Sequence, residues 1–268
     1  MLLADATAQV TIPTGNPVGT GSNTTLTRKP YGAFFGFERT ALIYLASEIG
    51  GPGQLNAIGF YLETASTPVN VPVNIHVKHT AAATFAATST VATEQTGATL
   101  VYSGTLSGWT AGAWKTVTLT TPFTYNGTDN LEIIIESNFG GSGGEGSSAK
   151  AFRYTNQGTG VNRGQYWQAD GSAPTGNGTL FIYRPNVQLT IANPCSGTPS
   201  ISGATALTSS FNCSGTPQLT LTSYPLTATG ITYQWQSSPA GLGTWTNVGT
   251  AQSTPVFTAP TITASTDY

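Results

Sequence analysis

Charged residues are scarce in this sequence. Asp, Glu, Lys and Arg make up 7% of its 268 residues, whereas an average domain contains about 25%. The nine basic residues are scattered along the chain, and the formal net charge is −2. Binding to nucleic acid relies on clustered Lys and Arg side chains that neutralise phosphates. The composition therefore argues against a nucleic-acid partner.

Long apolar runs and metal-binding residues are few as well. The sequence has no apolar run of the roughly 18 residues that a membrane-spanning helix needs. Its two histidines, His76 and His79, lie three positions apart in an alternating segment. Side chains at that spacing on a strand point to opposite faces, so this pair cannot hold one metal ion. We expect no membrane span, no metal and no cofactor.

Cysteine is equally rare, and both cysteines open the same pentapeptide, Cys-Ser-Gly-Thr-Pro, at Cys195 and Cys213. Two thiols are too few for a structural zinc site. A disulfide is compatible with an exported chain, and Cys195–Cys213 is the only bridge that this sequence offers. The alternative is that Cys213 pairs with a cysteine beyond residue 268. We interpret Cys195 as the start of a second domain and leave its pairing open.

The glycine-rich segment "GGSGGEG", residues 140–146, formally matches two motifs of enzymes. A G-x-G-x-x-G loop must open a helix, and a G-x-S-x-G elbow must join a strand to a helix. The segment that follows, "SSAKAFRYTN", indicates a turn into a strand instead. We interpret residues 140–146 as a flexible hairpin loop, and we expect the chain to have no enzymatic activity.

Alternating apolar and polar residues are abundant. This period of two is typical of antiparallel strands with one buried face. It occurs in the segments "VNVPVNIHVKH", "NLEIIIE", "WKTVTLTTPF" and "RPNVQLTI". The pattern predicts at least eight strands within residues 8–192, arranged as two antiparallel sheets. The only predicted helix is one turn in "LASEIG". Four aromatic residues are predicted to lie in the core, namely Phe60, Trp114, Phe123 and Tyr233. Glu132 and Glu136 are expected on a solvated outer face.

A domain boundary is predicted near residue 193. Residues 10–193 hold enough strands for one β-sandwich, and the pattern restarts in residues 194–268. There, Trp235 fits the buried Trp of an immunoglobulin-like (Ig-like) domain. Tyr268 fits the Tyr that stands two residues before the second cysteine of such domains, so we expect the last two strands to be missing. Residues 1–9 are interpreted as a signal-peptide remnant or, alternatively, a flexible N-terminus.

Several segments, taken in order, resemble a known module. Residues 28–191 resemble the N-terminal jelly-roll-like module of large surface proteins that Bacteroidota export by the type IX system. The matching segments are "FFGFERTALIYLASEIG", "LNAIGFYLETASTPVNVPVNIHVKHT", "VYSGTLSGWTAGAWKTVTLTTPFTYNGTDNLEIIIE" and "YRPNVQLTIANPC". Residues 195–268 resemble the Ig-like or PKD-like repeat that often follows, with "TYQWQSS" and "GTWTNVGTA". The resemblance implies an all-β, jelly-roll-like sandwich, further Ig-like repeats beyond residue 268, and an adhesive role at the cell surface. It supplies no catalytic residue.

One aromatic segment, "NRGQYWQADG", is the candidate binding site. Tyr166 and Trp167 are adjacent, so on a strand they point to opposite faces and one ring is expected outside. With Arg163 and the neighbouring amides, such a ring suits stacking on a sugar and hydrogen bonding to its hydroxyls. The alternative is that one ring packs in the core while the other covers a sheet edge. The candidate ligand-binding residues are Arg163, Tyr166 and Trp167, and the candidate partner is an extracellular polysaccharide or glycan.

Two functions follow from these observations. The first is a non-catalytic, secreted surface protein of the adhesin type that binds glycans weakly and multivalently. The alternative is a carbohydrate-binding or spacer module of a larger secreted hydrolase or protease.

Overall fold

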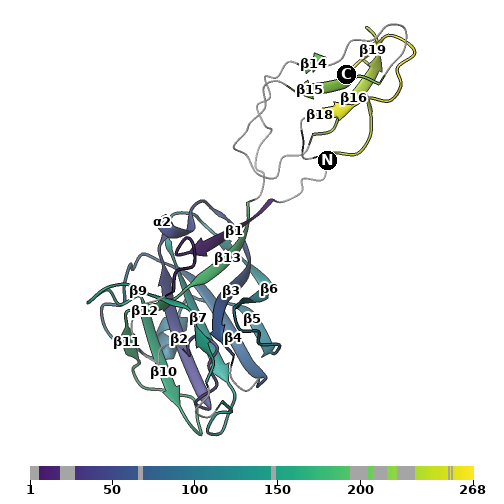
Figure 1. The fold of residues 1–268 in the computed structure, drawn as a ribbon. Coiled ribbons are helices and arrows are strands. Elements are labelled where there is room, and N and C mark those ends of the chain that lie inside the picture. Colours follow the sequence, from purple (N-terminus) through teal and green to yellow (C-terminus); the bar gives the residue numbers. More distant parts are fainter. Residues whose placement is uncertain are drawn as a thin grey trace. The chain divides into compact units, whose positions relative to one another are not determined.

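The protein is almost entirely β-structure. The computed structural model describes residues 6–18, 28–65, 69–145, 149–193, 205–207, 216–221, 233–252, 254 and 256–268. Two short helices occur in this part of the chain, α2 (Ala46–Ile49) and α3 (Val91–Gln95). The chain divides into two compact units, residues 8–192 and residues 193–268 with 1–7 (Figure 1). The cysteines Cys195 and Cys213 lie outside the described residues.

The first unit contains two main sheets. The five-stranded sheet has the strand order β1–β13–β3–β6, with β8 paired to one end of β3. Its strands are β1 (Ala6–Ile12), β13 (Val187–Asn193), β3 (Gly53–Thr64), β6 (Ala113–Tyr125) and β8 (Ala151–Phe152). β3 pairs antiparallel with β13 on one side and with β6 on the other.

The six-stranded sheet has the order β11–β10–β2–β7–β4–β5, and all its pairings are antiparallel. Its strands are β11 (Thr179–Phe181), β10 (Gly164–Ala169), β2 (Phe37–Tyr44), β7 (Asn130–Asn138), β4 (Val71–Thr80) and β5 (Thr99–Leu106). A small ladder of β12 (Tyr183–Pro185) and β9 (Tyr154–Asn156) joins the unit. The predicted all-β sandwich with almost no helix is confirmed, as is the single turn of "LASEIG", which is α2, but the second short helix, α3, was not predicted.

The apolar faces of the two sheets form one core. It joins Ile58 and Phe60 of β3 to Leu42 of β2, Ile75 of β4 and Ile133 of β7, all fully buried. The alternation in the sequence selects these residues because successive side chains on a strand point to opposite faces. Of the predicted inward residues of the four quoted segments, Val69 is partly buried and the others are buried: Val71, Val73, Ile75, Val77, Val117, Leu119, Leu131, Ile133, Ile135, Val187, Leu189 and Ile191.

Trp114 does not lie in this core, and the prediction for it was wrong. β3 and β6 pair so that Trp114 stands opposite Tyr61, whereas Phe60 stands opposite Lys115. Because Phe60 faces the core, Trp114 and Tyr61 face outward, where their rings meet edge to face at 5.4 Å. The alternation that buries Val117 places the even-numbered residues of β6 on the outer side.

A segment between β4 and β5 covers the outer face of the six-stranded sheet. Phe85 and Val91 from this segment pack on Ala41, Ile43 and Ile134 and form a second buried cluster. The helix α3 in it begins after Thr90, whose hydroxyl accepts a hydrogen bond from the Thr93 amide at 3.2 Å.

The same cover corrects the prediction for Glu132. Its outward-facing side chain was expected in solvent but is only 2% exposed. Lys78 Nζ lies 3.2 Å from its carboxylate. Burial, with Glu94 nearby, raises the pKa of Glu132 to about 8. Glu136 keeps partial exposure and pairs with Arg39 at 3.1 Å.

The described part of the second unit contains two three-stranded sheets, ordered β14–β15–β18 and β17–β16–β19. Their strands are β14 (Thr205–Leu207), β15 (Gln218–Leu221), β18 (Val256–Thr258), β17 (Thr246–Asn247), β16 (Gln236–Pro239) and β19 (Thr266–Asp267). Trp235 stacks on Phe257 with ring centroids 5.5 Å apart, and Tyr268 lies tilted at 6.1 Å from the same ring. Trp235 and Tyr233 are half-buried rather than enclosed. The Ig-like character of this unit stays a prediction.

Candidate functional site

Trp167 lies in β10 and belongs to the second buried cluster, on the outer face of the six-stranded sheet. Its side chain is 3% exposed. The indole Nε1 donates to the Ser89 carbonyl at 3.0 Å. Because the segment between β4 and β5 encloses the ring, Trp167 does not present a free aromatic plate to a sugar.

Tyr166 points to the opposite side of β10, as adjacent strand residues must. It is partly buried against the main core, and its ring meets Phe181 edge to face at 5.9 Å. Lys29 Nζ lies 5.2 Å from the ring centroid. The two rings thus face opposite sides as predicted, and because Trp167 is buried and Tyr166 is partly buried, neither is a freely exposed ring.

Arg163 takes part in a different set of contacts. Its Nη1 donates to Gln157 Oε1 at 2.7 Å and lies 3.9 Å from Glu48 Oε1. Burial and the neighbouring Arg184 lower the pKa of Arg163, and Glu48 opposes this shift. The structure therefore brings Tyr166 and Trp167 to one place, with Arg163 in another.

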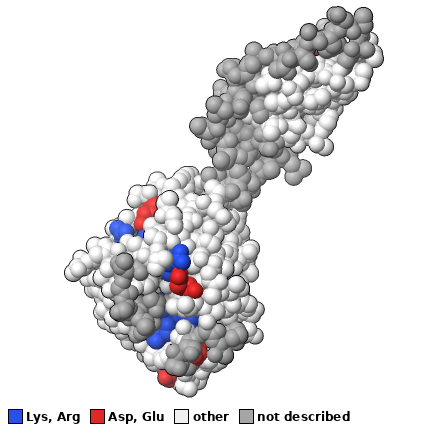
Figure 2. Space-filling model, viewed as in Figure 1, with Lys and Arg blue, Asp and Glu red and all other residues white. Residues whose placement is uncertain are grey.

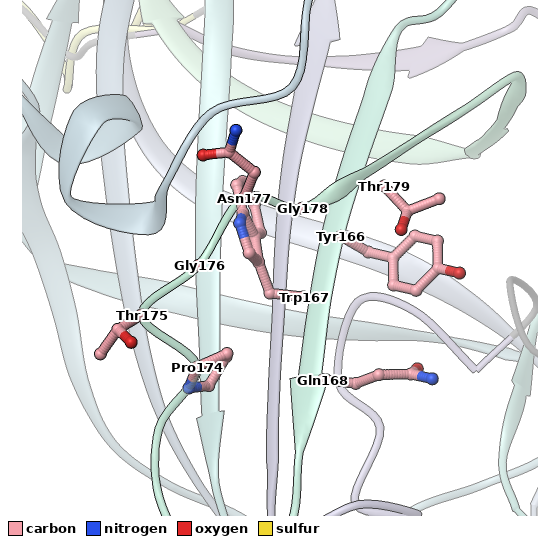
Figure 3. A pocket seen from close by; sticks show the side chains of 9 residues that line it. All are labelled: Tyr166, Trp167, Gln168, Pro174, Thr175, Gly176, Asn177, Gly178 and Thr179. Atoms are coloured by element: carbon pink, nitrogen blue, oxygen red, sulfur yellow. The ribbon is translucent and has the colours of Figure 1, made fainter.

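An open pocket of about 290 Å³ lies beside β10 (Figure 3). It forms where β11 begins, because β11 pairs with β10 only from Gly164 to Tyr166 and Thr179, its first residue, stands opposite Tyr166. The residues that line it come from β10, from the loop before β11 and from the first residue of β11. They are Tyr166, Trp167, Gln168, Pro174, Thr175, Gly176, Asn177, Gly178 and Thr179.

The loop before β11 approaches the Trp167 ring closely. A Cβ atom added at Gly178 would lie 2.6 Å from the indole, so only glycine fits there. The Gly178 amide also donates to the Ser89 carbonyl at 2.9 Å, the same oxygen that the Trp167 indole uses. In Figure 3, Asn177 lies over Trp167, Thr175 and Pro174 lie on one side, and Thr179 and Gln168 lie on the other. Trp167 thus shapes the wall of the pocket, and its buried ring is not available to stack on a bound ligand.

All nine residues that line the pocket are uncharged. Side-chain hydrogen-bonding groups come from Thr175, Asn177 and Thr179, whereas Gln168 Oε1 already accepts a hydrogen bond from Lys29. Three of these residues, Thr175, Asn177 and Thr179, were not predicted as site residues and occur in the turn-like stretch "PTGNGT". A turn signal was visible there, but nothing in it shows that the turn folds back along β10.

Most charged groups are engaged elsewhere, in ion pairs. All glutamates, and all basic residues except Lys115, lie within 4.0 Å of an opposite charge. Lys115 donates to the Ser107 carbonyl. Figure 2 accordingly shows few charged side chains on the face that it draws.

The two histidines also have separate surroundings. His76 faces Glu136, with 3.9 Å between the imidazole and the carboxylate, and burial lowers its pKa. His79 Nε2 accepts a hydrogen bond from the Asn126 amide at 3.1 Å. In the described ranges, no group of three or more His, Cys, Asp or Glu side chains is arranged to hold a metal ion. No helix among these residues is long and apolar enough to cross a membrane.

Comparisons with known proteins add no relatives. The chain matches no protein-family model, no curated protein and no solved structure. The resemblance to a type IX surface module stays a prediction.

Proposed function

We propose that this chain is a non-catalytic binding module that holds neutral carbohydrate in the pocket beside β10. The observation that carries the proposal is the chemistry of the pocket lining, in which every residue is uncharged and three exposed side chains, of Thr175, Asn177 and Thr179, offer hydroxyl or amide groups. Sugars are neutral and rich in hydroxyls, and they are bound by a few well-placed polar groups beside apolar surface. We further propose that the protein acts outside the cell as an adhesin-type protein, and this part of the proposal rests on the resemblance described above.

Binding at one such pocket should be weak. The pocket is open, and the Trp167 ring is buried, so the sugar gains little from aromatic stacking. Useful attachment to a polysaccharide then requires several copies that bind together, since linked sites raise the effective concentration for each other.

The proposal is tested by displaying the whole chain multivalently and measuring its binding to an array of neutral glycans. Thr175→Ala and Asn177→Ala remove exposed pocket side chains and should weaken binding with no loss of stability. Thr118→Ala is the matched control, since Thr118 is equally exposed but lies on β6. Binding that survives both pocket substitutions would place the site elsewhere. No binding to any neutral glycan would contradict the proposed function.

A further inference from the structure

Two lysines and two glutamates lie together inside the first unit with almost no exposure to solvent. Lys29 and Glu38 are 0% exposed, Lys150 is 1% exposed and Glu145 is 3% exposed. Lysine and glutamate are among the residues least often buried, and burying their charges is costly even in pairs. They come from the segment before β2, from β2 itself and from the segment between β7 and β8. Because burying two ion pairs is unfavourable for folding, we looked to the chemistry of these side chains for an explanation of their position.

The backbone holds the two carboxyl groups next to each other. The Ala33 amide donates to Glu145 Oε2 at 3.2 Å, and the next amide, of Phe34, donates to Glu38 Oε2 at 3.3 Å. The glycine-rich loop makes this approach possible. Gly143 has a φ of +82°, and a Cβ atom there would lie 2.1 Å from the Phe34 carbonyl oxygen. The loop therefore delivers Glu145 to a fixed place beside Glu38.

The two lysines differ in their hydrogen bonds. Lys29 Nζ donates to Glu38 Oε1 at 2.5 Å and to Gln168 Oε1 at 3.2 Å. Lys150 Nζ contacts Glu145 Oε1 and lies 4.4 Å from the centre of the Trp109 ring. Neither Lys150 Nζ nor Glu145 Oε1 has a hydrogen-bond partner in the described part of the chain. A stable buried ion pair normally has such partners, so this amine and carboxyl group face each other without the usual support.

We propose that Lys150 and Glu145 condense to an intramolecular amide, an isopeptide bond between the two side chains. The neutral amine Nζ attacks Cδ of the protonated Glu145 carboxyl group. The Nζ–Cδ bond forms and one Cδ–O bond breaks. The departing oxygen leaves as water, with its own proton and one proton from Nζ. No oxidant or reductant is needed.

Glu38 is placed to assist the reaction through its charge. Its carboxylate acts electrostatically on Lys150, and it is fixed on the amide next to the one that holds Glu145. The negative charge of Glu38 favours the positive charge that develops on Nζ as the amine attacks, and the proton then passes from Nζ to the departing oxygen. Burial lowers the pKa of Lys150 to about 8, against the opposing charge of Glu38, so the neutral amine is accessible near neutral pH. The product is a neutral amide, which is buried at a lower cost than two ions.

The wild-type protein alone tests the bond, by trypsin digestion and mass spectrometry. Trypsin does not cut after an acylated lysine, so the expected peptide is residues 116–153, uncut after Lys150 and lighter by one water molecule. Without the bond, the digest contains residues 116–150 at full mass, and that result would overturn the proposal. The same digest contains residues 29–39, which report on Lys29 and Glu38. Loss of water there instead would show that the wrong pair was assigned.

Variants then test the roles of the residues. Lys150→Arg keeps the positive charge, lacks the reactive amine, and should leave the intact chain at its full mass. Lys78→Arg is the matched control, because Lys78 also pairs with a buried glutamate, and it should leave the water loss unchanged. Glu38→Gln removes the negative charge of this side chain and should slow bond formation by roughly 100-fold, as the loss of one preorganised electrostatic group does. Formation at the wild-type rate in Glu38→Gln would overturn the role of Glu38 while the digest still decides the bond.

Discussion

Phe60 and Trp114 give a direct test of how β3 and β6 are paired. Phe60 stands opposite Lys115 and faces the core, whereas Trp114 stands opposite Tyr61 and faces outward. Phe60 is fully buried, and its ring meets Tyr31 edge to face at 5.4 Å. Truncation to alanine should therefore have very different effects at these two neighbouring positions.

The magnitudes follow from what each ring contacts. Phe60→Ala removes a buried ring and leaves a cavity, which should lower the free energy of unfolding by ~3–5 kcal/mol. Trp114→Ala removes an edge-to-face pair on the outer surface, worth ~0.5–1.5 kcal/mol. In a unit of this size each kcal/mol shifts the melting temperature by about 2–4 °C, so the two variants should be clearly separated.

The assay is urea unfolding of the whole chain followed by circular dichroism, with thermal melting alongside. Two-state fits with an unchanged slope against urea would show that both variants unfold like the parent. If Trp114→Ala costs as much as Phe60→Ala, the inward and outward faces of β6 are assigned the wrong way round.

Two further predictions concern buried charges. Glu48→Ala should destabilise the protein by ~3–5 kcal/mol, because it leaves the Arg184 side chain, which is 2% exposed, without its ion-pair partner. Glu63→Ala breaks the more exposed pair with Arg153 and should cost only ~0–1 kcal/mol. Equal losses of stability in urea unfolding would contradict this difference. Glu132 has a folded-state pKa of about 8, raised from 4.5, so the stability it contributes is present below pH 4.5 and is lost as the pH rises through about 8. Glu132→Gln should flatten the fall in melting temperature between those pH values, and an unchanged fall would assign it to other groups.

The strands could be predicted from the sequence because a strand repeats every two residues, and the pattern can be counted along the chain. Ile133 and Val187 needed no knowledge of their neighbours. Trp114 was misplaced because its size was given more weight than its position in that count. Glu132 was misplaced because its exposure depends on a covering segment whose own sequence is typical of a loop.

The candidate site was harder to predict, since it depends on contacts between distant segments. Tyr166 and Trp167 were found because paired aromatics stand out locally. Thr175 and Asn177 did not stand out, because nothing local shows that their turn folds back along β10. The buried lysines and glutamates were counted as scattered charges, and only the folded chain brings Glu38 and Glu145 onto consecutive amides.

The pairing of all the glutamates and of most basic residues within the chain has a consequence for the salt concentrations that the protein tolerates. Dissolved salt weakens protein contacts mainly by screening exposed charges. Here the glutamates are already paired, and so are the basic residues other than Lys115. Few free surface charges are left for dissolved ions to act on. We expect the contacts made by this surface to keep their strength whether the surrounding water is fresh or saline.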